Sequence, residues 1–184
     1  MSIINVVGAK IWGGGEQYVY DICKQLQQRH RTAYILVDQS NEDMQSRYAQ
    51  VGHVITGNLY TLKGFLSVNA VAKQMKEKGI HTIVCHSGKY ILFCIALKQL
   101  TGAKLVFIKH NLVPGKTDIY HRWINAQVDA FVCVSKLVYD DLMTPAIKDT
   151  SKYHVVYNGI DPNRFQSFSD AVPMKYKVRT FGYR

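Results

Sequence analysis

Short, continuous apolar runs alternate with longer amphipathic segments along most of this chain, and this alternation is its most constraining feature. Residues 34–37, 105–108 and 130–134 are apolar throughout. They lack the alternation of apolar and polar residues that is typical of a strand with one solvent-exposed face. Such strands, separated by helical segments, belong to a parallel sheet covered on both faces. The sequence therefore predicts an α/β fold with helices on both faces of a parallel sheet.

The elements are expected in the following order. Strands are predicted at 3–7, 34–37, 54–55, 80–85, 105–108, 130–134 and 154–157. Helices are predicted at 16–30, from Asn41 through Met44 and Tyr48, at 61–78, 90–97 and 136–143, and in a polar segment that carries Ile119, Trp123 and Val128. Asn41 is expected to cap its helix, and Gly79 to end the helix before it.

A chain of 184 residues has room for one such core but not for two domains of ordinary size. Residues 1–165 are expected to form one domain, and residues 166–184 a linker and the first strand, at 175–182, of a truncated second domain. Because that strand has no fold of its own, we expect the chain to belong to a longer protein.

The sequence also predicts a cytoplasmic location. The N-terminus has no basic start or small-residue cleavage site, and no apolar run approaches the roughly 20 residues of a membrane span. The cysteines lie in apolar segments and form no C-x-x-C pair, so we expect four buried, reduced thiols.

Positive charge is concentrated in residues 44–128, which hold eleven Lys or Arg residues and two acids, whereas the rest of the chain is almost balanced. Such an excess favours an anionic partner, for which a membrane surface with anionic headgroups is one candidate. The alternative is an ordinary solvated surface. Nucleic acid is not expected as the partner, because no recognition motif accompanies the basic stretch.

Ligands of parallel sheets bind beyond the carboxyl ends of the strands, and this rule selects the candidate site residues. The positions selected are Gly13, Gly14, Gly15, Glu16, His86, Ser87, His110, Asn111 and Ser135. Glycines between a strand and a helix let backbone N–H groups approach a phosphate; the alternative is a tight turn that needs a positive φ. Two histidines at one edge favour a site over a structural role.

Several other kinds of site are excluded because the sequence lacks the motifs that they require. The glycines lack the G-x-G-x-x-G spacing of a dinucleotide site, and Ser87-Gly88-Lys89 lacks the remainder of a phosphate-binding P-loop. The segment 85–88 is not the nucleophile turn of a serine hydrolase. No third ligand has suitable spacing from the two histidines, so no metal site is expected.

The segments 129–135 and 155–161, with Phe165, resemble the end of the N-terminal domain of group 1, or family 4, glycosyltransferases. Gly13-Gly14-Gly15-Glu16 is similar to the glycine–glutamate loop of that family, His110 to its histidine after an internal strand, and 181–184 to the start of its C-terminal domain. The resemblance implies the N-terminal half of a GT-B fold, which consists of two Rossmann-like domains that face each other across a cleft.

The resemblance also implies roles for the candidate residues. The N-terminal domain would bind the acceptor, a glycan or a lipid-linked sugar, through Glu16, His86, Asn111 and Ser135. Gly13, Gly14 and Gly15 would approach the phosphates of a nucleotide-sugar donor, and His110 would act in catalysis by binding the transferred sugar. Transfer would retain the anomeric configuration and would need no metal and no cofactor besides the donor.

This chain lacks the family's Glu-x7-Glu donor motif, so alone it is expected to bind acceptor or membrane and to have little transferase activity. An exposed apolar patch is expected where the missing parts would pack. The expected biological role is cell-surface polysaccharide synthesis at the cytoplasmic face of the membrane. Two alternatives remain open: a non-catalytic module that binds membrane or polyanion, and a nucleotide-sugar epimerase.

Overall fold

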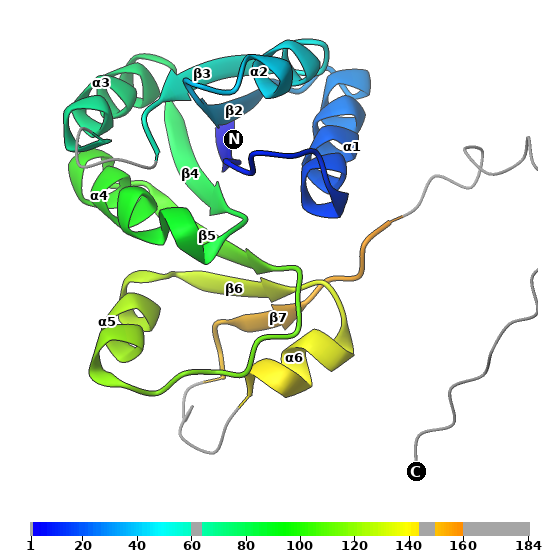
Figure 1. The fold of residues 1–184 in the computed structure, drawn as a ribbon, viewed down its shortest axis with the longest axis vertical. Helices are drawn as coiled ribbons and strands as arrows, with labels where there is room; N and C mark the ends of the chain where they lie inside the picture. Colours follow the sequence, from blue (N-terminus) through cyan, green and yellow to red (C-terminus); the bar gives the residue numbers. More distant parts are fainter. Residues whose placement is uncertain (1, 60–63, 144–149, 160–184) are drawn as a thin grey trace, which may run out of the picture.

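Strands of this chain form a seven-stranded sheet in the order β3-β2-β1-β4-β5-β6-β7, and every neighbouring pair is parallel (Figure 1). The structure is a computed structural model that describes residues 2–59, 64–143 and 150–159, with side chains described from residue 67 onward in the second range. The predicted α/β class and the parallel sheet are confirmed.

The elements agree with the predicted order, and their ends differ from the prediction by a few residues. The strands are β1 (Ser2–Val6), β2 (Ala33–Asp38), β3 (His53–Gly57), β4 (Ile80–Cys85), β5 (Lys104–Lys109), β6 (Ala130–Cys133) and β7 (Tyr153–Val155). The helices are α1 (Gly14–Gln28), α2 (Glu42–Ala49), α3 (Gly64–Glu77), the 3-10 turn η1 (Gly88–Tyr90), α4 (Ile91–Thr101), α5 (Ile119–Gln127) and α6 (Lys136–Leu142). The predicted linker and the predicted strand 175–182 lie outside the described residues.

Helices cover both faces of the sheet, as the apolar strands require (Figure 1). On one face, α1 and α2 pack their apolar side chains against β2, where Ile35 and Val37 point toward them. On the other face, α3, α4, α5 and α6 form the larger core with the alternate residues of the strands, such as Leu36 and Phe107. Residues 35 and 36 thus enter different cores, which is the geometry of a strand buried on both sides.

Local sequence signals fix the ends of several helices. The Asn41 side chain accepts a hydrogen bond from the Met44 backbone N–H at 3.2 Å, so it caps α2 as predicted. Gly79 has φ +61° just after α3, the left-handed conformation expected of a residue that ends a helix. The cysteines Cys23, Cys85, Cys94 and Cys133 are all buried, as predicted, and no disulfide joins them.

The order of the strands reverses at β1. The chain moves from β1 outward to β2 and β3, and then returns to the other side of β1 with β4. Ligands of open parallel sheets bind in the crevice beyond the carboxyl ends of the two strands where the order reverses. Here those strands are β1 and β4, so the topology draws attention to Val7–Gly15 after β1 and to His86 after β4.

Candidate functional site

Two histidines that follow neighbouring strands meet at this edge of the sheet. His86 directly follows β4, His110 directly follows β5, and these two strands pair in parallel. The His86 Nδ1 atom lies 3.1 Å from His110 Nε2, and the two rings are stacked with their centroids 5.4 Å apart. The structure therefore brings the two histidines together, as the positions of the strand ends predict.

A buried asparagine in β1 orients the pair. Asn5 is almost fully buried, and its Oδ1 lies 3.1 Å from His86 Nε2 while its Nδ2 faces the Cys23 sulfur at 3.9 Å. An amide oxygen can only accept, so His86 Nε2 carries the proton and His86 Nδ1 has a lone pair. His110 Nε2–H therefore donates to His86 Nδ1.

The remaining ring nitrogen of His110 is the atom that this arrangement presents to a ligand. His110 Nδ1 has no hydrogen-bond partner within the described residues and is not enclosed by protein. Because His110 Nε2 carries the proton, Nδ1 is a hydrogen-bond acceptor whenever the ring is neutral. A hydroxyl group is the natural partner for an acceptor of this kind.

Both rings are held neutral by their surroundings. Burial, with a smaller contribution from His110, lowers the pKa of His86 to about 3. Burial also lowers the pKa of His110 below its ordinary value. The pair is therefore uncharged near pH 7, and its proton positions are set by hydrogen bonds rather than by titration.

Tyr18 connects the histidine pair to helix α1. Its ring meets His110 edge-on at 5.1 Å between centroids and His86 edge-on at 6.1 Å. Tyr18 lies one turn after Gly14, so the glycine-rich start of α1 and the histidine pair share the same edge of the sheet. Asn5 and Tyr18 were not predicted as site residues. The one sequence signal for Asn5 is a polar residue inside an otherwise apolar strand.

The glycine cluster forms the exposed beginning of α1, which starts two residues earlier than predicted. Gly13 is the N-cap in extended conformation, and Gly14 and Gly15 lie in the first turn. Among the described glycines only Gly79 and Gly102 have a positive φ, so a tight left-handed turn does not explain the cluster. A Cβ added to Gly14 or Gly15 would meet nothing within 4 Å.

The other predicted residues are placed as follows. Glu16 bends its carboxylate back toward Gly13, where Oε2 lies 3.2 Å from the position of an added Cβ. Asn111 is exposed next to His110. Ser135 lies one strand farther along the edge, after β6, and its hydroxyl oxygen accepts from the Val138 N–H at 3.2 Å to cap α6. The structure thus gives Ser135 a capping role and does not bring it to His86.

A buried acid at the same edge has a structural role. Asp38, at the end of β2, accepts hydrogen bonds from the Leu59 N–H at 2.8 Å and the Ser40 N–H at 3.0 Å. Burial raises the pKa of Asp38, but the hydrogen bonds from Ser40 and Leu59 outweigh burial and hold it below its usual value. Because its oxygens are occupied in this way, Asp38 fixes the segments after β2 and β3 rather than a ligand.

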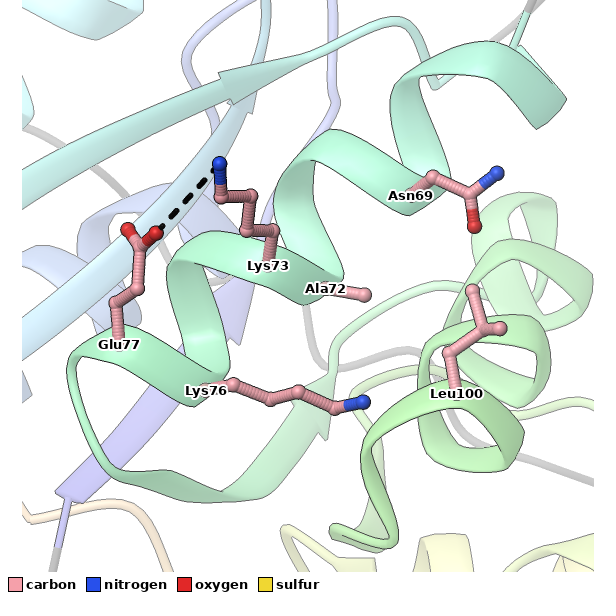
Figure 2. Close-up of a pocket in the computed structure, with 6 residues that line it drawn as sticks. All are labelled: Asn69, Ala72, Lys73, Lys76, Glu77 and Leu100. Atoms are coloured by element: carbon pink, nitrogen blue, oxygen red, sulfur yellow. Dashed lines mark ion pairs between the residues drawn. The ribbon is translucent and has the colours of Figure 1, made fainter.

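Hollows on the surface lie away from the histidine pair. One, of about 300 Å³, lies between α3 and α4 on the outside of the helices, where Lys76 extends toward Leu100 and Lys73 pairs with Glu77 at 4.0 Å (Figure 2). Another, of about 260 Å³, is lined by Trp12, Gln17, Tyr20, Arg47 and Gln50 beside the glycine cluster. Neither hollow is lined by His86 or His110.

The described ranges contain no group of three or more His, Cys, Asp or Glu side chains that could hold a metal ion. In the same ranges, no helix is long and apolar enough to cross a membrane.

Residues 12–164 match the model of the family described as Glycosyltransferase Family 4. This chain belongs to glycosyltransferase family 4. The match includes the glycine cluster, both histidines and Ser135, and the family assignment agrees with the resemblance seen in the sequence.

Solved structures resemble this family 4 domain over most of its length. A glycosyltransferase from Rickettsia africae superposes with a TM-score of 0.76 at 19% identity and covers 94% of this chain. HepE of Anabaena in complex with UDP gives 0.69 at 18% identity over 90% of this chain, and MurG of Acinetobacter baumannii gives 0.62 at 12% over 94%. At these identities the likeness establishes the fold, the N-terminal half of GT-B.

The family 4 domain described here spans only part of these relatives. It covers 46% of the Rickettsia protein, 46% of HepE and 50% of MurG. No curated protein matches the chain. The activity and substrates of a whole enzyme are therefore matters for proposal.

Proposed function

We propose that this domain is the acceptor-binding half of a retaining glycosyltransferase. The enzyme would transfer a sugar from a nucleotide-sugar donor to a glycan or lipid-linked acceptor in cell-surface polysaccharide synthesis. The observation that carries the proposal is the His86–His110 pair, which lies with the open glycine cluster at one edge of the sheet. Membership of family 4 supplies the class of reaction.

The start of α1 is suited to a diphosphate. Gly14 and Gly15 have no neighbours that would require glycine within the chain, so the missing side chains leave room for something outside it. Unpaired backbone N–H groups and the helix dipole favour negative charge at such a terminus. HepE has been solved with UDP and with UDP-glucose, which supports a nucleoside diphosphate sugar as the donor class.

Transfer breaks the bond between the anomeric carbon and the diphosphate oxygen and forms a bond to the oxygen of an acceptor hydroxyl, whose proton would pass to the departing diphosphate. Negative charge grows on the departing diphosphate, where the N–H groups of Gly14 and Gly15 would stabilise it. His110 would accept a hydrogen bond from a hydroxyl of the donor sugar through Nδ1 and so hold the anomeric carbon in place. Glu16 and Asn111 lie at the same edge and would contact the acceptor. His86, whose two ring nitrogens bind Asn5 and His110, would act by holding His110 in place.

The remaining parts of the proposal concern location and partners. We propose that the enzyme works at the cytoplasmic face of the membrane, because the proposed lipid-linked acceptor would be anchored in a membrane and residues 44–128 carry a strong excess of positive charge. In this proposal the enzyme uses the nucleotide sugar as a substrate and needs no cofactor.

The test is a transfer assay with a protein that carries this domain together with a donor-binding domain. It would be incubated with a panel of nucleotide sugars, and sugar transfer, hydrolysis and anomeric configuration would be followed by NMR. His110→Ala should lower kcat/KM about 10- to 100-fold, because one hydrogen bond to the sugar is lost. The matched control, His81→Gln, changes an exposed histidine of β4 and should have no effect.

Each other outcome of this assay would contradict the proposal. Release of an epimerised nucleotide sugar without transfer would identify an epimerase. Binding of membrane or polyanion without any turnover would identify a non-catalytic module. Inversion of the anomeric configuration would remove the retaining mechanism from the proposal.

A further inference from the structure

Lys109, the last residue of β5, is a half-buried cation next to His110. Its Nζ lies 5.0 Å from the centre of the Phe107 ring, so the side chain folds back over the sheet. The Val134 N–H donates to the Lys109 carbonyl at 3.2 Å and holds this backbone at the carboxyl edge. The structure therefore fixes a positive charge beside the candidate site.

No acid neutralises this charge within the described residues. The Lys109 Nζ has no ion pair and no hydrogen bond there, and it is not sealed from solvent. Burial lowers the pKa of Lys109 below its ordinary value; the thiols of Cys133 and Cys85 oppose this to a smaller extent, and Lys116 adds to it. An ammonium group that has lost part of its water without gaining an acid is stabilised by an anion that can reach it.

Two other lysines show how a half-buried ammonium is satisfied in this fold. Lys98 pairs with the Asp129 carboxylate at 2.7 Å, and Lys152 donates to the Val128 carbonyl at 3.4 Å. These two and Lys109 are the half-buried lysines of the described residues, and the other lysines described are exposed. Of the three, Lys109 is the one without an oxygen partner among the described residues, which indicates a charge that is available to a ligand.

The chain around Lys109 is basic as well. Residues 78–117 contain six lysines and neither Asp nor Glu. Lys89 follows β4 and Lys116 follows β5, and both side chains are exposed. Ser87 accepts a hydrogen bond from the Lys89 N–H at 3.3 Å and so fixes the turn that carries this lysine. An anion that approaches Lys109 along these segments therefore meets further positive charge.

Lys109 and His110 point toward opposite faces of the sheet, as successive residues of an extended chain do. The His110 ring meets the Tyr18 ring of α1 at 5.1 Å between centroids. Lys109 instead lies over Phe107, which belongs to the core formed with α3, α4, α5 and α6. Since the glycine cluster begins α1, the proposed donor diphosphate would lie on the far side of His110 from Lys109.

We propose that Lys109 binds a negatively charged group of the acceptor, which is a phosphate or a carboxylate. An ammonium group forms charge-assisted hydrogen bonds with either of these groups. The donor diphosphate is assigned to the other side of His110, so the anion that reaches Lys109 belongs to the acceptor. This inference rests on the proposed function and narrows its acceptor class to molecules with a negative charge close to the sugar that is extended.

Anion binding by the chain itself can be measured without turnover. The ¹³C NMR shift of each lysine Cε follows the titration of that lysine, and the spectrum of Lys109→Gln identifies the signal of Lys109. Inorganic phosphate should raise the pKa of Lys109, because a bound anion favours the charged form. It should leave the signal of Lys104, an exposed lysine at the other end of β5, unchanged. An equal response of both lysines, or none, would overturn the proposal.

Kinetics of the larger protein show which substrate carries the anion. Three acceptors with the same sugar would be compared, one with a phosphate ester, one with a carboxylate and one uncharged. Lys109→Gln should raise KM for the preferred charged acceptor and lower kcat/KM about 10- to 100-fold, because a charge-assisted hydrogen bond is lost. KM for the nucleotide sugar and transfer to the uncharged acceptor should not change. The charged acceptor with the larger loss identifies the group as phosphate or carboxylate.

Matched variants separate binding from packing. Lys109→Arg keeps the charge and should retain most of the activity toward the charged acceptor, whereas Lys109→Met keeps the apolar stem and should behave like Lys109→Gln. Lys104→Gln removes the same charge from the other end of β5 and should have no effect. Equal losses with charged and uncharged acceptors would show a packing role, and a raised KM for the nucleotide sugar alone would assign Lys109 to the donor. Either result overturns the proposal.

The result is separable from that of the proposed function. If the larger protein transfers sugar from a nucleotide sugar but Lys109→Gln affects no acceptor, the anion site is refuted and the transferase assignment stands. If the larger protein uses no nucleotide sugar while phosphate still raises the pKa of Lys109, the proposed function fails together with the acceptor assignment, whereas anion binding by Lys109 stands.

Discussion

The orientation of one buried amide decides which atom His110 offers to a ligand. With its oxygen toward His86, Asn5 forces the proton onto His86 Nε2 and, through the pair, onto His110 Nε2. With the amide reversed, both histidines would carry their protons on Nδ1, and His110 would become a donor. The contact of Asn5 Nδ2 with the Cys23 sulfur fits the first arrangement.

This proton arrangement can be measured and changed. Long-range ¹⁵N–¹H NMR should show both His86 and His110 protonated on Nε2 near neutral pH. Asn5→Asp places a carboxylate next to His86 Nε2 and should raise the pKa of His86. The protonated ring would then donate from Nδ1 to His110 Nε2, which drives the His110 proton to Nδ1.

Asn69→Asp is the control, because it adds the same charge at an exposed position of α3. It should leave both tautomers unchanged. A His110 ring that carries its proton on Nδ1 in the unaltered chain would contradict the assignment.

A substitution in the glycine cluster gives a second test at the scale of residues, because it should impair nucleotide-sugar use without lowering the stability of the fold. Gly15 lies in α1 without a positive φ and without a neighbour within 4 Å of an added Cβ. Gly15→Ala should leave the free energy of unfolding unchanged or raise it by up to about 1 kcal/mol, because alanine favours helix. If the donor diphosphate approaches these amides, the same change should impair nucleotide-sugar use in the larger protein; full activity would refute that approach.

At the scale of elements, most of the fold could be predicted from the sequence, because buried parallel strands are short, continuous apolar runs that alternate with amphipathic segments. The start of α1 was predicted two residues late, since glycine has a low helix propensity and the cluster suggested a loop. The histidine pair could be predicted from strand ends alone. Asn5 and Tyr18 could not, because only the pairing of β1 with β4 and the packing of α1 bring them to His86.

The sequence also does not predict which side of α5 packs against the core. Periodicity identifies Ile119 and Trp123 as apolar positions of a helix, but it does not say whether that side meets the core. The structure places Ile124 inward and leaves the other two outside. Contacts from distant residues hold the end of α5, where Lys98 donates to the Gln127 carbonyl and Lys152 to the Asn125 carbonyl, and no local pattern encodes them.

The cap of α2 gives a prediction at this scale, because it connects two elements. Asn41 Oδ1 accepts from the Met44 N–H, and Asn41 Nδ2 donates to the Ala9 carbonyl in the segment after β1 at 3.0 Å. Asn41→Ala should lower the free energy of unfolding by about 1–2 kcal/mol in urea titrations. Asn69→Ala, at an exposed position within α3, is the control; an equal loss in both variants would show that the cap contributes nothing specific.

At the scale of the whole molecule, the hydrogen-bonding groups of the candidate site gather at one end of the sheet. The carboxyl edge of β1, β4 and β5 holds Asn5 and the His86–His110 pair, whereas α5 lies toward the ends where the strands begin (Figure 1). The edge depends on two half-buried histidines that stay neutral. The stability of the whole domain should therefore depend on pH in a way that exposed histidines would not produce.

The direction of this pH dependence follows from the pKa of His86, which is about 3 in the folded chain, whereas the ordinary value is 6.5. Between these values the unfolded chain binds a proton that the folded chain excludes, so stability falls as pH drops below about 6.5. The slope is at most about 1.4 kcal/mol per pH unit for one histidine, and His110, whose pKa is also lowered, acts in the same direction. Urea titrations at about pH 7 and about pH 5 avoid the lower range where carboxylates with lowered pKa protonate. His86→Gln should flatten this dependence even if it lowers stability at neutral pH, and His81→Gln should not; equal slopes in all three proteins would mean that the pair is not buried and neutral.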